Sequence, residues 1–251
     1  MNAQDRRNQI ASILLAEETI KIGKIAERFD VSTETIRKDL ILLEKMGIAR
    51  KKHGHAQVLG ASSESNYSYK AQQNVEQKCK IAAESAKLVP DGSTIIIDAG
   101  STTFYFSRQL LLKKDITVIT NFMPIGQLMS AGNINTIILG GQVQPISKSM
   151  TGTFAENALS RLHADIAFLS TSGIANRQGP CVELFPEAQI KKLMIRNADM
   201  CYLLADSSKA SINPLIQFAD WSDFTAIISD DQLTDEDMVY LEDHLKVIIA
   251  K

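Results

Sequence analysis

The chain has 251 residues, of which 45% are hydrophobic and 22% are charged, and its formal net charge at pH 7 is −2. This composition is typical of a globular protein, and the length allows two domains with a sizeable core. The apolar runs are too short to cross a bilayer, the N-terminus lacks a secretory signal, and three cysteines and four histidines show no disulfide or metal spacing. We therefore expect a cytoplasmic protein that makes no membrane contact and holds no metal and no cofactor.

Residues 22–46 predict two helices separated by a tight turn. The first helix is indicated by apolar residues at i, i+3, i+4 and i+7, namely Ile22, Ile25, Ala26 and Phe29. Ser32 is a good N-cap for the second, because its hydroxyl can accept a hydrogen bond from a first-turn N–H, and Val31 and Ile36 are spaced as a hydrophobic staple. The second helix would bury Ile36, Leu40 and Leu43, and Gly47 suits its C-terminal end.

A basic segment follows the second helix. Residues 48–58 form two short segments around Gly54 and contain no acidic residue, which indicates a hairpin that tracks phosphates. Two helices, a tight turn and a basic hairpin are the layout of a winged helix-turn-helix, which we assign to residues 1–58. The candidate DNA contacts are the outward residues near the start of the second helix and the basic strand: Ser32, Thr33, Glu34, Thr35, Arg37, Lys38, Arg50, Lys51, Lys52 and His53. Such helices also occur in proteins that never bind DNA, and it is the basic hairpin that favours double-stranded DNA.

The charge is divided unevenly along the chain. Residues 1–60 carry a net charge of +3, and the remaining residues carry −5. The positive excess is small, so we expect one copy to bind DNA weakly and a homodimer or homotetramer to read repeated half-sites. Residues 59–74 are rich in Ser and Asn and show no sustained apolar period, so we read them as a linker.

Residues 75–251 alternate short apolar runs with helical segments. The runs are 94–97, 116–119, 136–139, 166–169, 201–205, 226–228 and 247–249, and the helical segments are 78–89, 102–112, 124–131, 154–163, 186–199 and 234–244. Continuous β-branched runs are typical of parallel strands buried on both faces. The pattern predicts a doubly wound α/β domain, whose ligands bind beyond the carboxyl ends of the strands.

Small polar clusters follow these runs and define a candidate effector site. In the first, Gly100 permits close backbone approach, and Ser101, Thr102 and Thr103 precede a helix whose free N–H groups suit a phosphate. Taken singly, each cluster is also explained as ordinary turn or capping chemistry, and their coincidence favours a site. The candidate effector-binding residues are Asp98, Gly100, Ser101, Thr102, Thr103, Asn121, Gly140, Gly141, Lys148, Gly152 and Lys209.

These motifs resemble those of the DeoR family of bacterial sugar-metabolism regulators. The resemblance runs through Val31-Ser32, 36–40, 43–44 and 50–54, and continues through 98–103, 120–121, 139–141, Gly152, 165–173, 191–195 and 206–209. It implies a transcriptional regulator, expected to repress, that a phosphorylated sugar releases from its operator. One departure is His55, where the family commonly has a second glycine.

Two other functions are considered. The family's effector domain is similar to ribose-5-phosphate isomerase, which makes a sugar-phosphate isomerase the main alternative. Isomerases place an Asp-Gly-Ala-Asp run after the strand that contains Asp165, whereas this chain has Leu169-Ser170-Thr171-Ser172, without a carboxylate base. We therefore predict a pocket that binds without catalysis. A scaffold with a vestigial DNA-binding head is the third reading, which the salt dependence of DNA binding would distinguish.

Overall fold

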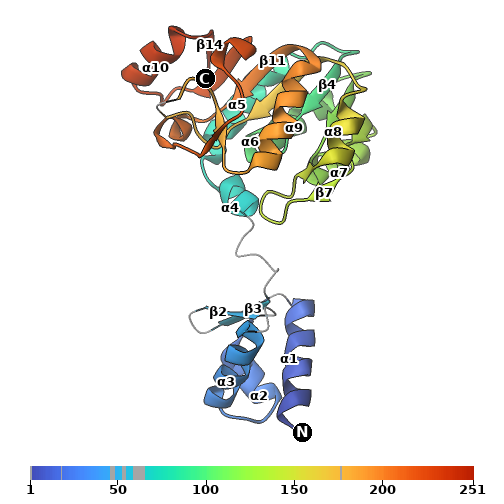
Figure 1. Cartoon of the computed structure of the whole chain (residues 1–251), viewed down its shortest axis with the longest axis vertical. Helices are drawn as coiled ribbons and strands as arrows, with labels where there is room; N and C mark the ends of the chain where they lie inside the picture. The colour runs from blue at the N-terminus through green and yellow to red at the C-terminus, as the bar shows by residue number, and fades with distance from the viewer. Residues whose placement is uncertain (1, 18, 46–48, 53–54, 59–65, 176) are drawn as a thin grey trace. The chain divides into compact units, whose positions relative to one another are not determined.

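The computed structural model describes residues 2–17, 19–45, 49–52, 55–58, 66–175 and 177–251. The chain divides into two compact units, Met1–Ser65 and Asn66–Lys251 (Figure 1). Within the described ranges, no helix is long and apolar enough to cross a membrane.

The described residues of the N-terminal unit form three helices and a small antiparallel sheet. Its elements are α1 (Ala3–Glu17), β1 (Thr19–Lys21), α2 (Ile22–Arg28), α3 (Thr33–Lys45), β2 (Ala49–Lys52) and β3 (His55–Val58), with strand order β1-β3-β2. The predicted apolar stripes form its core, in which Ile25, Ile36 and Leu40 are buried. The winged helix-turn-helix prediction is thus confirmed, and β1 is an addition, since three residues are too few to show a strand pattern.

An ion pair joins two helices of this unit. Arg6 Nε on α1 lies 2.6 Å from Asp39 Oδ2 on α3, and both side chains are largely buried. Asp39 faces inward beside Leu40, while the neighbouring Arg37 and Lys38 are exposed. The pair therefore fixes the long first helix against the helix that presents the candidate DNA contacts.

The body is built on a sheet of seven parallel strands, one at each predicted run. The strands are β4 (Thr94–Ile97), β5 (Thr117–Thr120), β6 (Asn135–Ile138), β9 (Ala164–Ser170), β11 (Ala198–Leu204), β13 (Ala226–Asp230) and β14 (Val247–Ala250). Their order is β14-β13-β11-β9-β4-β5-β6. From β4 the chain adds strands on one side and then crosses to β9 on the other, so the order reverses between β4 and β9. This is the point at which an open α/β sheet forms its binding crevice.

Helices cover both faces of this sheet (Figure 1). One face packs against α5 (Val75–Lys87), α6 (Ser101–Gln109) and α7 (Met123–Ala131), and the other against α8 (Thr153–Leu159), α9 (Phe185–Arg196) and α10 (Asp235–Glu242). Successive side chains of β4 point to opposite faces of the sheet, so both faces are apolar and need cover. Ile95 and Ile97 pack in the core beneath α5, α6 and α7, and Ile96 packs in the core on the other face. The doubly wound α/β prediction is confirmed.

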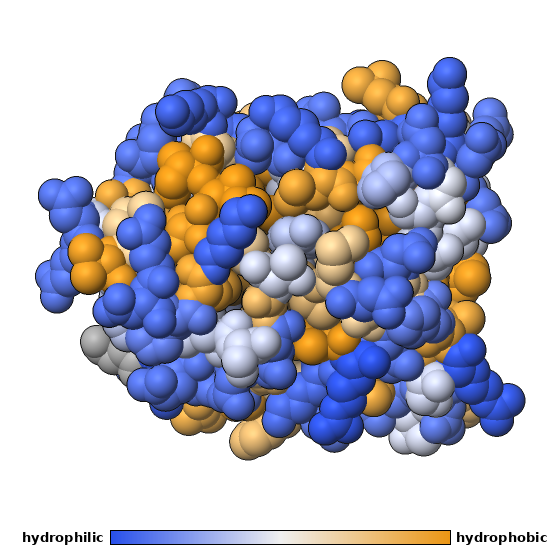
Figure 2. All heavy atoms as spheres, turned by 90° about the horizontal axis from the view of Figure 1, so that it is seen from above, coloured by the Kyte–Doolittle hydropathy of each residue, from blue (hydrophilic) through white to orange (hydrophobic). Residues whose placement is uncertain are grey.

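Short elements complete the body. They are the 3-10 helices η1 (Leu110–Leu112), η2 (Ser207–Ser211) and η3 (Trp221–Asp223), and the two-residue strands β7 (Gln142–Val143), β8 (Met150–Thr151), β10 (Cys181–Val182) and β12 (Ile216–Gln217). Figure 2, which views the body from above, shows apolar side chains gathered in the middle of this face and hydrophilic side chains around its rim.

One helix lies inside the predicted linker. Residues 59–65 fall outside the described residues, but Asn66–Gln72 form helix α4 instead of a linker. Tyr67 anchors this helix, because its ring packs edge-on against the rings of Phe122 and Phe104, with ring centroids 4.8 Å and 6.2 Å apart. A single aromatic anchor in a polar segment leaves no apolar period in the sequence, which explains the error.

Candidate functional site

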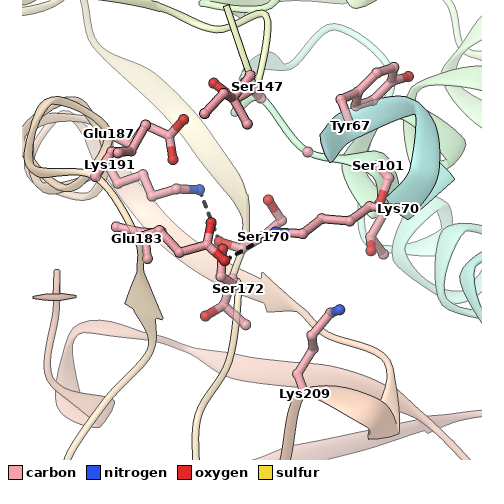
Figure 3. Close-up of a pocket in the computed structure, with 17 residues that line it drawn as sticks. Tyr67, Lys70, Ser101, Ser147, Ser170, Ser172, Glu183, Glu187, Lys191 and Lys209 are labelled. Carbon is pink, nitrogen blue, oxygen red and sulfur yellow. Dashed lines mark hydrogen bonds and ion pairs between the residues drawn. The ribbon is translucent and has the colours of Figure 1, made fainter. Parts of the chain in front are cut away.

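A cavity of about 270 Å³ opens at the carboxyl ends of β4 and β9, where the strand order reverses. Figure 3 shows side chains from several elements that point into it. The lining residues are Tyr67, Lys70, Ala99, Gly100, Ser101, Thr102, Ile146, Ser147, Ser170, Thr171, Ser172, Val182, Glu183, Leu184, Glu187, Lys191 and Lys209. Its position is the one expected for a ligand site in this type of sheet.

The floor of the cavity is a buried polar network centred on Asp98. Oδ2 of Asp98 accepts hydrogen bonds from the Ser170 N–H at 2.8 Å and the Ser170 hydroxyl at 2.9 Å, and it pairs with the ammonium of Lys191. Lys191 also donates to the carbonyl of Ser170 at 2.9 Å. Among the described residues, no hydrogen bond reaches Asp98 Oδ1. Asp98 therefore holds Lys191 and Ser170 in place from beneath the pocket and is not itself part of the lining.

One wall is the start of α6. Gly100 is its N-cap in an extended conformation, and no described side chain caps the first turn. A Cβ added to Gly100 would lie 2.1 Å from Ser170 Oγ, so only glycine fits at this position. Ser101 and Thr102 line the pocket, whereas Thr103 donates its hydroxyl to the carbonyls of Asp98 and Gly100, each at 3.1 Å. Free N–H groups and the helix dipole make this wall suited to an anion.

Three lysines and two glutamates provide the charges in the lining. Lys209 Nζ lies 4.0 Å from Asp206, and Lys70 Nζ on α4 lies 3.5 Å from Glu183 Oε1 (Figure 3). Glu187 is at 3.5 Å from the Ser149 hydroxyl, which is a weak hydrogen bond. Burial, with a smaller contribution from Tyr105, raises the pKa of Tyr67 to about 12, so its hydroxyl stays protonated. The cavity thus offers cations, hydroxyls and carboxylates, a set that matches a molecule with both a phosphate and hydroxyl groups.

The structure brings together part of the predicted effector set. Gly100, Ser101, Thr102 and Lys209 line the cavity, and Asp98 and Thr103 lie directly beneath it. The remaining predicted residues, Asn121, Gly140, Gly141, Lys148 and Gly152, do not line it.

The residues outside the lining shape the segment around β7 and β8. The Asn121 amide donates to the Met150 carbonyl at 3.0 Å, and Gly141 approaches Thr151 so closely that a Cβ would lie 2.5 Å from its carbonyl oxygen. Gly152, at φ +88°, is the N-cap of α8. From this segment Ile146 and Ser147, rather than the adjacent Lys148, reach the cavity.

Several lining residues were missed by the sequence prediction. Ser170, Thr171 and Ser172 belong to a strand-end cluster that the sequence showed, although they were not chosen as candidates. Glu187 and Lys191 lie four residues apart on α9, and that spacing is a signal for side chains on one helix face, whereas Glu183 precedes the helix. Tyr67 and Lys70 lie on α4, and no sequence signal marks them.

The candidate DNA-binding residues lie on α3 and β2. The Thr35 N–H donates to Ser32 Oγ at 3.1 Å, which is the predicted cap. Ser32, Thr33, Glu34, Arg37 and Lys38 are exposed, Thr35 is half-buried, and Arg37 lies 3.4 Å from Glu34. Arg50, Lys51 and Lys52 lie in β2, and His53 falls outside the described residues. Over the described ranges, no group of three or more His, Cys, Asp or Glu side chains is placed to hold a metal.

Comparisons with known proteins identify both parts of the chain. The family model of the DeoR-like helix-turn-helix domain matches residues 6–61, and that of the DeoR C terminal sensor domain matches residues 73–231. The chain is 34% identical to an uncharacterized HTH-type transcriptional regulator, YulB, of Bacillus subtilis (strain 168), over 97% of this chain and 95% of that protein. It is 30% identical to the lactose phosphotransferase system repressor of Streptococcus mutans, over 94% and 95% of the two chains.

Ribose 5-phosphate isomerase A of Methanocaldococcus jannaschii is 22% identical, with a TM-score of 0.41 over 55% of each chain. The family assignment rests on the two domain models and the full-length relatives. The chain belongs to the DeoR family of transcriptional regulators.

Proposed function

We propose that this protein is a DNA-binding regulator of a sugar-metabolism operon, and that a phosphorylated sugar releases it from its operator. The observation that carries the proposal is the cavity at the β4–β9 switch point, which combines the uncapped start of α6 with lysines and hydroxyls. The same chain carries a helix-turn-helix whose outward face includes Arg37 and Lys38. The relative named as a repressor of the lactose phosphotransferase system supports repression of a sugar operon.

The charges suggest how the ligand is oriented. The phosphate would bind between Gly100–Thr102 and Lys209, where N–H groups, the helix dipole and an ammonium favour a dianion. Sugar hydroxyls would then face Ser147, Glu187 and Ser170–Ser172, which can donate or accept hydrogen bonds. The ligand would thus connect α6 and η2 on one side to α9 on the other.

Release from DNA requires that the ligand favour one arrangement of the chain over another. Shifting a two-state equilibrium from 1:99 to 99:1 takes about 5.5 kcal/mol of differential affinity. Charge-assisted hydrogen bonds to a phosphate can supply much of it. We propose that the operator-bound form is a homodimer or homotetramer, because two or more copies of a helix-turn-helix can read repeated half-sites together.

An isomerase is the second candidate, because Glu183 and Glu187 add two carboxylates to a cavity in which the sequence showed none after β9. A carboxylate base must reach the proton that it abstracts at C1–C2 of the sugar. Glu187 lies 3.5 Å from the Ser149 hydroxyl, and relatives that match nearly the whole chain are named as transcriptional regulators and not as enzymes. We therefore propose that the pocket binds without turnover.

Calorimetric titration of the full chain with pentose and hexose phosphates tests this assignment, with the parent sugars and inorganic phosphate as controls. We expect one or a few sugar phosphates to bind and their unphosphorylated parents to bind far more weakly. The same compounds are then incubated with the protein and examined for aldose–ketose conversion against a heat-denatured control. Conversion above that control would support the isomerase, and binding of no phosphorylated compound would contradict the effector assignment.

A further inference from the structure

Helix α4 contributes to the pocket and also continues directly into the segment that leads to the N-terminal unit. Tyr67 and Lys70 line the cavity, and Asn66, the first residue of α4, follows residues 59–65 along the chain. The other pocket cations, Lys191 and Lys209, belong to α9 and η2. Of the pocket residues described, Tyr67 and Lys70 are therefore the ones nearest in sequence to the DNA-binding unit.

The C-terminal end of α4 is firmly held. The buried ammonium of Lys78 on α5 donates to the carbonyls of Lys70 and Gln73, and the Tyr105 hydroxyl donates to the Ala71 carbonyl at 3.2 Å. Burial lowers the pKa of Lys78 to about 8. Lys78 and Tyr105 thus hold the C-terminal half of α4, which includes the backbone of Lys70, and Tyr67 packs on Phe104 and Phe122 near the other end of the helix.

Asn74, two residues after the end of α4, is tied to the segment that carries Lys209. Asn74, in a left-handed conformation with φ 50°, donates its amide to Asp206 Oδ1 at 2.9 Å and to Ser208 Oγ at 3.0 Å. Asp206 is buried and is also the carboxylate nearest to Lys209. The anchored end of α4 and one wall of the pocket therefore share a hydrogen-bond network.

The three pocket lysines differ in how they are held. Lys191 is buried and bound to Asp98 and Ser170, and Lys209 is largely buried at 4.0 Å from the buried Asp206. Among the described residues, Lys70 is paired with Glu183 alone, at 3.5 Å, and the two side chains are 33% and 49% exposed. Exposed pairs at such distances contribute little, because water screens them. A dianionic group in the pocket would compete successfully with Glu183 for this ammonium.

We propose that Lys70 is the residue that senses the ligand: it exchanges Glu183 for the anionic group of a phosphorylated ligand and thereby shifts α4, the helix that follows the DNA-binding unit along the chain. This inference rests on the proposed function, since it requires an anionic ligand in the cavity. Figure 3 shows the geometry: Lys70 extends from α4 across the pocket toward Glu183.

Two substitutions of the same ion pair separate this role from a structural one. Lys70→Met keeps an apolar stem but removes the ammonium, and Glu183→Gln frees Lys70 from its partner. If the ion pair only held α4 in place, both substitutions would break it, and both would change the release of the protein from DNA in the same direction. The proposal instead predicts opposite effects on release of the protein from DNA that covers its own upstream region. Glu183→Gln lowers the ligand concentration that releases half of the DNA, and Lys70→Met raises it about tenfold or more.

The matched control is Lys80→Met. Lys80 lies on α5, pairs with Glu76 and Asp231, and has a side-chain exposure of 28%, close to that of Lys70, but it does not line the cavity. We expect Lys80→Met to bind DNA and ligand as the wild type does. The probes are inorganic phosphate, as the minimal anion, and the sugar phosphate that binds the wild-type chain most tightly in the calorimetric titration.

Two readouts decide the outcome. At ligand concentrations that saturate Lys70→Met by calorimetry, the variant should remain on DNA, and in the Lys70→Met background Glu183→Gln should lose most of its effect. If Lys70→Met saturated with ligand were fully released from DNA, the proposal would be overturned, because Lys70 would then only contribute to ligand affinity. An undiminished effect of Glu183→Gln in that background would overturn it too, because Glu183 would then act on the ligand directly. If the wild type binds no phosphorylated compound, the proposed effector function fails first, and this inference fails with it.

Discussion

At the scale of single residues, the pocket depends on a close approach at Gly100. A Cβ at this position would lie 2.1 Å from Oγ and 2.7 Å from Cβ of Ser170, and Ser170 is itself fixed by two hydrogen bonds to Asp98. The start of α6 and the end of β9 are therefore as close as a glycine backbone permits. This closeness directs the first turn of α6 into the cavity.

Gly100→Ala should accordingly disturb the site more than the fold. We expect a loss of about 1–3 kcal/mol in the free energy of unfolding of the body, as for other overpacked positions, and loss of sugar-phosphate binding. DNA binding without ligand should persist. Chemical denaturation and calorimetry measure both effects. Gly140→Ala is the control, since a Cβ there meets no atom within 4 Å. Wild-type ligand affinity in Gly100→Ala would mean that the ligand does not contact this turn.

Lys78 gives a prediction on pH. Burial lowers its pKa from 10.5 to about 8 in the folded chain. Between pH 8 and pH 10.5, Lys78 binds more protons in the unfolded chain than in the folded chain, so its contribution to stability rises with pH. Burial also raises the pKa of Cys201 to about 12, an effect that opposes the trend above pH 9.

Comparison of the wild type with Lys78→Met cancels the contributions of the other groups. The free energy of unfolding of the wild type minus that of the variant should increase between pH 8 and pH 10. Urea denaturation at several pH values measures this difference. A difference that stays constant or falls with pH would show that Lys78 is protonated as readily in the folded chain as in the unfolded one.

The sequence predicted those site residues whose role follows from local structure. Gly100, Ser101, Thr102 and Lys209 come directly after strands, and the carboxyl ends of parallel strands meet at one edge. Lys70 reaches the pocket only because Tyr67 packs on α6, a contact between distant segments. The network of Lys191 and Asp98 likewise joins residues 93 positions apart. No local pattern in the sequence predicts contacts between residues so far apart along the chain.

At the scale of elements, the length of a segment decides how well the sequence predicts it. The seven apolar runs and the helices between them have enough residues for their period to be visible. β1, β7 and β10 have two or three residues and exist because of their partners, as when Ile20 of β1 pairs with Ala56 of β3. Helix α4 is similar, because its stability comes from packing rather than from its own polar sequence.

The packing of α1 on α3 should depend on the Arg6–Asp39 pair. Removing one partner of a largely buried pair leaves the other charge uncompensated, which costs about 3–5 kcal/mol. We expect Asp39→Ala to unfold the N-terminal unit at a lower temperature and to abolish DNA binding, while the body melts as before. Calorimetric melting follows the two units. Glu34→Ala, which removes an exposed pair with Arg37, is the stability control. If the N-terminal unit melted at the same temperature in both variants, the Arg6–Asp39 pair would have no role in holding α1.

At the scale of the whole molecule, the two compact units divide the function between them. The exposed face of α3 would contact base edges, and the cavity of the body would bind the effector. Their tasks should therefore be separable by mutation.

Arg37→Ala tests that separation. Arg37 is exposed near the start of α3, and loss of a base contact costs about 1–3 kcal/mol, so DNA affinity should fall roughly tenfold or more. Sugar-phosphate affinity measured by calorimetry should remain at the wild-type value. A simultaneous loss of both activities would mean that the two units do not act independently.

The most direct test of the account is fluorescence anisotropy of labelled DNA from the gene's own upstream region, bound by the full chain and titrated with sugar phosphates. The wild type should bind DNA in a salt-sensitive manner: the logarithm of its DNA-binding constant should fall by about 0.9 per phosphate contact for each tenfold rise in salt concentration. One sugar phosphate should release the protein from this DNA. Ser101→Glu, which places a carboxylate at the start of α6, should bind the same DNA and resist release at every ligand concentration. Release of Ser101→Glu at the wild-type ligand concentration would contradict the account, because the effector would then act from a site other than this cavity.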